Sequence, residues 1–319
     1  MALETKDKSV SVREFFEAAK TDSDMELEEG EAYLDNIIEE GSMNRPGLAL
    51  AGFFQYFAYK RVQVIGLAEA SYLKSLPKAD CERRLDQFFR SRIPCVVMSR
   101  NRHSLPGMKK LAQECRVPLL RSPMITKHFI TAATITLENL MSPRMKFQGT
   151  MIDIRGMGVL IHGEPGIGKS ETALALVERG NSFVSDDLTI LRRTNQGAIV
   201  GSASDATRYH MEIRGLGIIH VPSLFGVSAM RDSKRLDLII ELVRLAPGDE
   251  IDRTGLDQQT RNLLGVEIPF IRLPVAPGRD ITHVVEVAAL NQRLKILGHD
   301  AAKELDEKLM RMLARKGLE

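Results

Sequence analysis

Apolar and polar stretches follow one another along the first 126 residues in a pattern that predicts strands alternating with helices. Three short apolar runs have strand character: Arg61–Leu67, Pro94–Met98 and a run that starts at Val117. Helices are predicted between them over Cys81–Arg92 and Gly107–Cys115. Strands that alternate with helices indicate a mainly parallel sheet. We therefore expect an N-terminal α/β domain over residues 1–126.

The next helical pattern covers Lys127–Leu140 and is broken at Met141-Ser142-Pro143-Arg144. We place the domain boundary there. Residues 127–145 are predicted to form a connecting helix and linker, and residues 146–319 a second domain.

The second domain begins with two apolar runs, Thr150–Ile154 and Met157–Ile161, separated by Arg155-Gly156 as in a hairpin. A helix is predicted over Lys169–Arg179, and Phe183–Asp187 is a short strand that ends in two carboxylates. The remaining elements are a hairpin over Leu188–Leu191 and Ala198–Val200, a helix over Ile281–Leu297, and amphipathic helices over Asp232–Leu245 and Ala301–Arg315.

The first hairpin runs into a complete G-x-x-x-x-G-K-[ST] motif, Gly163-Glu164-Pro165-Gly166-Ile167-Gly168-Lys169-Ser170. Glycines let consecutive backbone N–H groups curl around a phosphate, and the following helix points its positive end at the same group. Lys169 would neutralise the outer phosphates, and the Ser170 hydroxyl would bind Mg²⁺. A glycine-rich turn before an ordinary helix is the alternative, but the flanking strand and helix are the context that the motif requires. The motif predicts nucleotide binding.

Asp186 and Asp187 end a strand only seventeen positions beyond Lys169. A P-loop fold places a magnesium-binding or water-orienting carboxylate at such a strand end. Asp is also common in turns and helix caps, which is the structural alternative. We favour the functional interpretation, because parallel neighbouring strands would bring this end beside the phosphate loop. His103 and His128 have no Cys, Asp or Glu at metal spacing, so we interpret them as surface or packing residues.

Charge and composition exclude several classes of protein. The 44 Lys and Arg residues nearly balance 42 Asp and Glu, which leaves no basic field for nucleic acid or a membrane surface. The N-terminus is polar rather than signal-like, and no run approaches the ~20 apolar residues of a membrane span. The three cysteines form no C-x-x-C pair and fit buried thiols in a reducing compartment. We expect a soluble, cytoplasmic protein.

Taken together, these motifs resemble the bacterial HPr kinase/phosphorylase family over nearly the whole chain. The resemblance is strongest over residues 149–297, and the run from Glu212 to Ile219 is specific to that family. It implies a kinase domain related to phosphoenolpyruvate carboxykinase, usually in a homohexamer. It also implies a reaction in which ATP and a divalent metal such as Mg²⁺ phosphorylate a serine of the phosphocarrier HPr, and inorganic phosphate removes that phosphate.

The resemblance also assigns roles to residues. Nucleotide binding falls on the motif from Gly163 to Ser170, with Lys169 also catalytic, and metal binding on Ser170 and Glu212. The pair Asp186-Asp187 matches the group that takes the serine proton, and Arg253 matches a catalytic arginine. Two further segments match functional ones: Met211–His220 for both directions of the reaction and Pro274–Arg279 for dephosphorylation.

Gln148 departs from the family, which commonly has a histidine at this position. A neutral amide cannot take or give a proton at pH 7, so this departure bears on the phosphorylase direction. Two other hypotheses stay open from the sequence. One is a small-molecule kinase on the same scaffold, and the other is a nucleotide-sensing regulator that transfers nothing.

Overall fold

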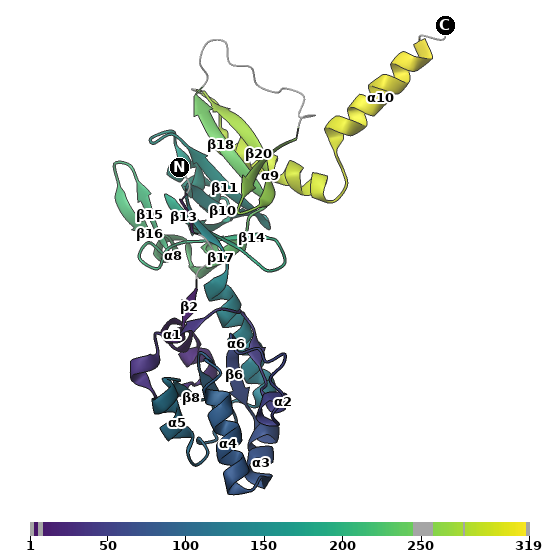
Figure 1. Ribbon diagram of the computed structural model, residues 1–319. Coiled ribbons are helices and arrows are strands. Elements are labelled where there is room, and N and C mark those ends of the chain that lie inside the picture. Colours follow the sequence, from purple (N-terminus) through teal and green to yellow (C-terminus); the bar gives the residue numbers. More distant parts are fainter. Residues whose placement is uncertain (1–2, 6–8, 245–257, 277, 317–319) are drawn as a thin grey trace. The chain divides into compact units, whose positions relative to one another are not determined.

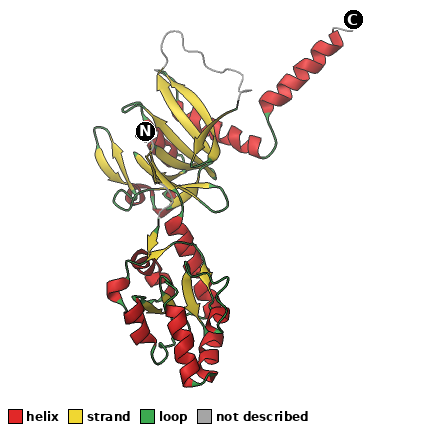
Figure 2. Cartoon of the chain, viewed as in Figure 1, coloured by secondary structure: helices red, strands yellow, loops and turns green. Residues whose placement is uncertain are grey.

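The computed structural model describes residues 3–5, 9–244, 258–276 and 278–316. The chain divides into two compact units (Figure 1), one of residues 7–142 and the other of the chain from Pro143 onward together with strand β1 (Leu3–Thr5). Helices predominate in the first unit and strands in the second (Figure 2). The protein is therefore a mixed α/β protein with several sheets.

The N-terminal unit is built on a five-stranded sheet in the order β3-β8-β7-β6-β5. Its strands are β3 (Glu26–Glu29), β5 (Met43–Asn44), β6 (Val62–Ile65), β7 (Val96–Met98) and β8 (Leu119–Arg121). The four strands from β5 to β8 run parallel, and only β3 is antiparallel to its neighbour. The mainly parallel sheet expected from the alternating pattern is confirmed.

Helices cover both faces of this sheet because the central strands bury side chains on both sides. Val64 and Val97 face one core together with helices α1 (Val12–Ser23) and α6 (Thr126–Met141). Ile65 and Met98 face the other core with α3 (Leu67–Ser75), α4 (Lys78–Phe89) and α5 (Met108–Cys115). The smaller elements of the unit are β2 (Val10–Ser11), β4 (Ile37–Ile38), η1 (Glu31–Tyr33) and α2 (Gly47–Leu50).

Helix α6 lies where the sequence predicted a connecting helix and linker over 127–145. Its buried residues Phe129, Ala133 and Leu137 belong to the core of the N-terminal unit. Their spacing of four residues places them on one helical face. The helix is thus a packed element of that unit, and the chain divides at Ser142 and Pro143.

The second unit contains two larger sheets that face each other. One has the order β1-β9-β13-β14-β17 and the other β12-β10-β11-β18-β20-β19. Side chains of both sheets, such as Phe147 and Leu191 of the first and Leu160 and Ile239 of the second, share one buried core. The strands of the first sheet after β1 are β9 (Arg144–Gln148), β13 (Leu188–Arg193), β14 (Ile199–Ser202) and β17 (Ser233–Arg235). Those of the second are β10 (Thr150–Ile154), β11 (Met157–Gly163), β12 (Ser182–Ser185), β18 (Leu238–Arg244), β19 (Gln259–Leu263) and β20 (Val266–Val275).

Helices α7 (Lys169–Glu178) and α9 (Ile281–Ile296) pack on the other face of the six-stranded sheet. Helix α10 (Ala301–Lys316) follows them. The hairpin of β15 (His210–Ile213) and β16 (Gly217–His220) forms a two-stranded sheet of its own, and α8 (Val221–Phe225) and η2 (Val227–Ala229) follow it.

Both predicted hairpins of this unit are confirmed. Strands β10 and β11 pair antiparallel, and their turn residues Arg155 and Gly156 have φ of 49° and 93°. Two successive residues with positive φ are the conformation that a two-residue hairpin favours. Strands β13 and β14 pair antiparallel as well.

The helix predicted over Asp232–Leu245 is wrong. Residues Ser233–Arg235 and Leu238–Arg244 are strands β17 and β18, and Leu245 lies outside the described residues. Strand β18 pairs with a parallel neighbour on each side and is buried on both faces. Such a strand is a continuous apolar run, which periodicity alone does not distinguish from a buried helix.

The expected position of strand β12 also needs a correction. It is not a parallel neighbour of β11, because β10 lies between them and pairs antiparallel with both. Two antiparallel steps leave β12 and β11 pointing in the same direction. The end of β12 therefore still lies at the edge of the sheet where β11 ends.

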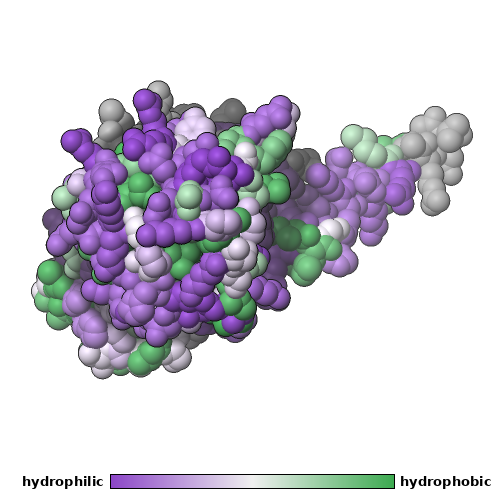
Figure 3. Space-filling view, turned by 60° about the horizontal axis from the view of Figure 1, so that its bottom comes forward, coloured by the Kyte–Doolittle hydropathy of each residue, from purple (hydrophilic) through white to green (hydrophobic). Residues whose placement is uncertain are grey.

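Among the described helices, none is long and apolar enough to cross a membrane. Hydrophilic side chains make up most of the face seen in Figure 3, and hydrophobic ones form small separate groups there. Isolated exposed apolar residues are normal on a protein surface.

Candidate active site

The glycine motif forms a loop, called the GKS loop below (residues 163–170), that joins strand β11 to helix α7. Gly163, Gly166 and Gly168 have φ of 150°, 74° and 104°. Glycine adopts such values readily, whereas other residues are strained there. A Cβ on Gly163 would also come within 2.5 Å of the Leu242 carbonyl oxygen. The backbone path of the loop therefore requires the glycines that the motif contains.

The Lys169 side chain lies against this loop rather than in solvent. The residue is 7% exposed, and Nζ donates to the carbonyl oxygens of Gly163 and Glu164, each at 3.3 Å. Both hydrogen bonds are longer than the usual ~2.9–3.0 Å. The ammonium can exchange them for the oxygens of an anion in the loop.

Asp186 is a buried carboxylate that accepts hydrogen bonds from three different elements. The Thr150 hydroxyl donates to it at 2.7 Å, the Ser170 hydroxyl at 3.1 and 3.2 Å, and the Glu212 backbone N–H at 3.1 Å. Burial raises the pKa of Asp186, although these hydrogen bonds favour the ionised form and oppose the shift. Asp186 thus connects β10, the first turn of α7 and strand β15.

Asp187 occupies a tight reversal of the chain and is exposed. Its φ is 57°, and the Leu188 N–H donates at 2.6 Å to the Asp186 carbonyl, two residues back in the sequence. The Gly149 N–H donates to the Asp187 carbonyl at 2.9 Å, so the backbone on both sides is fixed. Residues other than glycine rarely adopt the left-handed backbone conformation, and Asp and Asn tolerate it best. The reversal separates the two carboxylates: Asp186 is buried beneath the GKS loop, and Asp187 lines the pocket.

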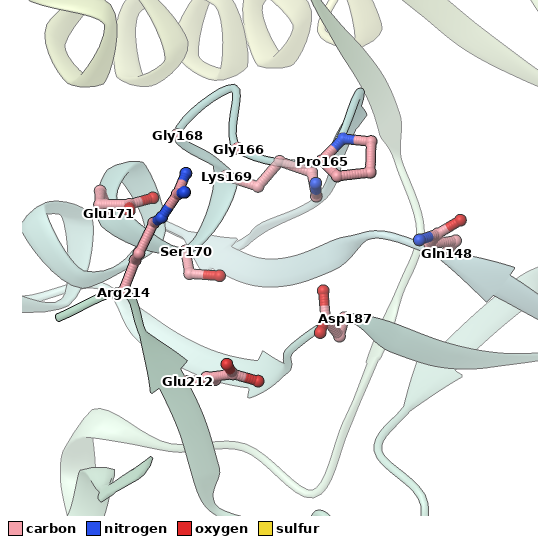
Figure 4. A pocket seen from close by; sticks show the side chains of 10 residues that line it. All are labelled: Gln148, Pro165, Gly166, Gly168, Lys169, Ser170, Glu171, Asp187, Glu212 and Arg214. Atoms are coloured by element: carbon pink, nitrogen blue, oxygen red, sulfur yellow. The ribbon is translucent and has the colours of Figure 1, made fainter. Parts of the chain in front are cut away.

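A pocket of about 580 Å³ lies over the GKS loop (Figure 4). Its lining brings together parts of the chain that are far apart in sequence: Gln148, Pro165, Gly166, Gly168, Lys169, Ser170, Glu171, Asp187, Glu212 and Arg214. In Figure 4, Gln148 and Asp187 lie on one side of the pocket, and Glu171 and Arg214 on the other. Two cationic and three anionic side chains line it.

No group of three or more His, Cys, Asp and Glu side chains that could hold a metal ion occurs in the described part of the chain. The Ser170 hydroxyl and the Glu212 carboxylate are among the oxygen donors that line the pocket. Mg²⁺ is usually bound through one or two carboxylates together with waters and substrate phosphates. The residues present fit such a partial site and do not form a complete cage.

The structure brings most of the sequence-predicted residues together. The GKS loop, Asp187 and Glu212 contribute to one pocket, and Asp186 lies directly behind it. Arg253 lies outside the described residues, as does Pro277 of the Pro274–Arg279 segment. Sequence reasoning gave no separate role to Glu171 and Arg214. Their signals were present, because Glu171 directly follows the motif and Arg214 lies two residues after Glu212.

His162, next to the GKS loop, does not line the pocket that Gln148 lines. Its ring lies between Phe147 and Phe270, with centroids 5.4 and 6.2 Å away, and it is not among the residues that line the pocket. The guanidinium of Arg261 lies 3.1 Å from Nε2 and can only donate, so Nε2 is unprotonated. Burial, with the nearby Arg261 charge, lowers the pKa of His162 to about 4. The ring is therefore neutral at pH 7.

Comparison with known proteins decides the family. A model described as HPr Serine kinase N terminus matches residues 10–137, and one described as HPr Serine kinase C-terminal domain matches residues 139–309. The chain belongs to the HPr kinase/phosphorylase family. Curated relatives of that name match this chain along nearly their whole length. One from Peptoclostridium acidaminophilum is 41% identical over 97% of this chain and 99% of its own. One from Leptospira biflexa is 40% identical over 93% of each.

A solved structure named as the Hpr(Ser) kinase/phosphatase from Coxiella burnetii is also similar to this family member. It is 36% identical, covers 50% of this chain and 97% of its own, and superposes with a TM-score of 0.46.

Proposed function

We propose that this chain is a protein serine kinase that transfers a phosphoryl group from ATP to HPr, and that the same pocket removes it with inorganic phosphate. The proposal rests on membership of the family and on one structural observation. An exposed carboxylate, Asp187, lies in the same pocket as the GKS loop, where a phosphoryl group and an acceptor hydroxyl can meet. We further propose that the protein acts in the cytoplasm in the regulation of carbon metabolism and assembles as a homohexamer. We also propose that its catalytic unit is related to phosphoenolpyruvate carboxykinase.

Asp187 is the proposed general base. A serine hydroxyl is a poor nucleophile, and a carboxylate within hydrogen-bond reach accepts its proton as the oxygen attacks phosphorus. Asp186 cannot fill this role without losing its existing contacts, since its oxygens accept three donors and it is buried. This assignment divides the pair into a base and a positioning residue.

The phosphates of ATP are proposed to lie in the GKS loop, against its backbone N–H groups and Lys169. The terminal phosphate then lies towards Asp187 and the acceptor serine. Serine loses its proton to Asp187, a bond forms between its oxygen and the terminal phosphorus, and ADP leaves. Lys169 stabilises the charge on the transferring group. We propose that Arg253, outside the described residues, adds a second cation there.

We propose that Ser170 and Glu212 would hold Mg²⁺, which would neutralise phosphate charge when bound. The Ser170 hydroxyl donates its hydrogen to Asp186, so its lone pairs are free for a cation. The backbone of Glu212 is held by the same carboxylate. Asp186 therefore orients both proposed metal ligands, and such supporting contacts usually matter nearly as much as the ligands.

The reverse reaction uses the same groups and balances without a further reactant. Hydrogen phosphate attacks the phosphorus of phosphoserine, the bond between phosphorus and the serine oxygen breaks, and pyrophosphate forms. Asp187 takes the proton of hydrogen phosphate and passes it to the serine oxygen, so no other proton source is needed. Gln148 lies near Asp187 in the pocket (Figure 4) and can donate a hydrogen bond but not a proton.

The test is incubation of the protein with ATP labelled at its terminal phosphate, Mg²⁺ and HPr. We expect label on HPr, and none on an HPr variant whose acceptor serine is alanine. Unlabelled phospho-HPr with labelled inorganic phosphate should yield labelled pyrophosphate. Label on a small metabolite instead would contradict the proposal and favour a small-molecule kinase. ATP binding without any transfer would favour a nucleotide-sensing regulator.

A further inference from the structure

Arg214 reaches the GKS loop from a strand hairpin that pairs with neither of the large sheets of its unit. It follows β15, and its guanidinium lies so close to the loop that a Cβ on Gly166 would be 3.3 Å from Nη1. The side chain is exposed and lines the pocket. Within the described part of the chain, no carboxylate lies within ion-pairing distance of it. Arg214 is therefore a cation beside the GKS loop, and no carboxylate in the described part of the chain competes with a bound anion for it.

The position of Arg214 along the pocket suggests which phosphate it meets. Figure 4 shows Asp187 and Gln148 on one side of the loop and Arg214 with Glu171 on the other. The acceptor serine must reach Asp187, so the transferred phosphoryl group lies on that side. A phosphoryl donor that extends across the loop then places its other phosphates near Arg214.

The pocket also needs a cation at this place. Glu171, Asp187 and Glu212 contribute three carboxylates to the lining, against Lys169 and Arg214. Glu171 lies on the same side as Arg214, and its charge would repel a phosphate there (Figure 4). The ammonium of Lys169 lies at the start of the loop, where it contacts the carbonyl oxygens of Gly163 and Glu164. Arg214 is the lining cation on the side of Glu171.

We propose that Arg214 binds the phosphate that is not transferred: the β-phosphate of the nucleotide in the kinase direction and the attacking inorganic phosphate in the reverse direction. The two occupy the same place, because each lies in line with the transferred phosphoryl group, opposite the serine oxygen. A guanidinium suits this role, since its planar N–H groups bind two phosphate oxygens at once. This inference rests on the proposed function.

The binding of inorganic phosphate should depend on Arg214 more than the binding of ATP does. ATP keeps its adenosine and its other phosphates as contacts, whereas inorganic phosphate has only the site itself. Hydrogen bonds to charged groups contribute enough that losing them weakens binding ~10–100-fold. We expect Arg214→Ala to raise the KM for phosphate by about that factor, with a smaller rise in the KM for ATP. Arg214→Lys should lie between, because it keeps the charge but not the paired N–H groups.

The experiment measures KM and kcat in both directions for the wild type, Arg214→Ala, Arg214→Gln and Arg214→Lys. Equilibrium binding of ADP and of inorganic phosphate, by calorimetry, is measured on the same proteins. Arg83→Ala is the matched control, because Arg83 is an exposed arginine of helix α4, outside this unit. Circular dichroism checks the fold, and Arg214→Lys carries the test if the shorter side chains disturb it.

Two results would overturn the inference. The first is phosphate KM and phosphate binding within about twofold of the wild type in folded Arg214→Ala, well below the expected loss. The second is a fall in kcat with unchanged phosphate binding, which would put Arg214 on the transferred group instead. Failure of the proposed function is recognised separately, because the wild type itself would then not phosphorylate HPr. Binding of ADP to the wild type and to Arg214→Ala would still show whether Arg214 contacts a phosphate.

Discussion

Replacing each carboxylate of the Asp186-Asp187 pair by asparagine should give two different defects. The two residues are adjacent in sequence, but one is buried with three hydrogen-bond donors and the other lines the pocket. A proton acceptor and a positioning residue respond differently to the loss of charge. The pair therefore tests the proposed mechanism at neighbouring positions.

Asp187→Asn should lower kcat for HPr phosphorylation ~10²–10⁴-fold, the usual effect of losing a general base. That range corresponds to ~3–5 kcal/mol of activation free energy. Stability should change by less than ~0.5 kcal/mol. In the described structure no hydrogen bond reaches the Asp187 carboxylate, and asparagine tolerates a φ of 57°.

Asp186→Asn should lower stability. Asparagine offers one acceptor oxygen and an NH₂ group where Asp186 accepts from Thr150, Ser170 and the Glu212 backbone. At least one donor loses its partner, which costs about 1–3 kcal/mol. Burial disfavours the charge of Asp186 and raises its pKa, so removing that charge offsets part of the cost. The loosened Ser170 and Glu212 should also raise the Mg²⁺ concentration needed for half-maximal activity.

Initial rates with labelled ATP give kcat and the Mg²⁺ requirement, and urea unfolding followed by circular dichroism gives stability. Asp187→Ala, which cannot act as a base either, is the companion variant. The assignment is refuted if Asp186→Asn loses more kcat than Asp187→Asn with an unchanged unfolding transition. If neither variant loses at least about tenfold, both carboxylates are structural.

Three further predictions concern other residues of the site. Lys169→Ala should abolish detectable transfer while the protein stays folded, and near-normal kinase activity would remove the GKS loop from the mechanism. Gln148→His should raise phosphorolysis at saturating phosphate more than it raises kinase activity, since an imidazole with an ordinary pKa of ~6.5 can move a proton; brisk wild-type phosphorolysis that the change leaves unaltered would contradict this. His162 has a pKa of about 4 when folded, below its ordinary 6.5. As pH falls from 6.5 to 4, the imidazole is protonated in the unfolded chain but not in the folded one. The free energy of unfolding of the wild type should therefore drop over that window by up to ~3 kcal/mol more than that of His162→Gln. Urea unfolding of both proteins at several pH values measures the difference, and parallel curves would show that His162 is not held neutral.

Local signals made much of this protein predictable. The glycines of the GKS loop are needed for its backbone path, and Arg155-Gly156 forms a two-residue turn, so these elements depend on few neighbours. Alternating strands and helices were enough to predict the parallel sheet of the N-terminal unit. Elements whose conformation depends on distant neighbours were harder to predict from the sequence. Strand β18 was predicted as a helix because strands on both sides bury it, which removes the alternation that marks a strand.

The amino-acid sequence by itself determined the GKS loop, the strand that ends in Asp186-Asp187 and the segment that contains Glu212. Only the tertiary structure decided where these residues lie relative to one another and which of them are buried. The left-handed turn at Asp187 places one carboxylate in the pocket and leaves its neighbour buried with three donors. The tertiary structure also brings Arg214 to the loop, and it packs His162 against Arg261 and two aromatic rings rather than into the lining of the pocket. Burial and hydrogen bonding depend on which strands meet, and residue type and spacing do not specify that.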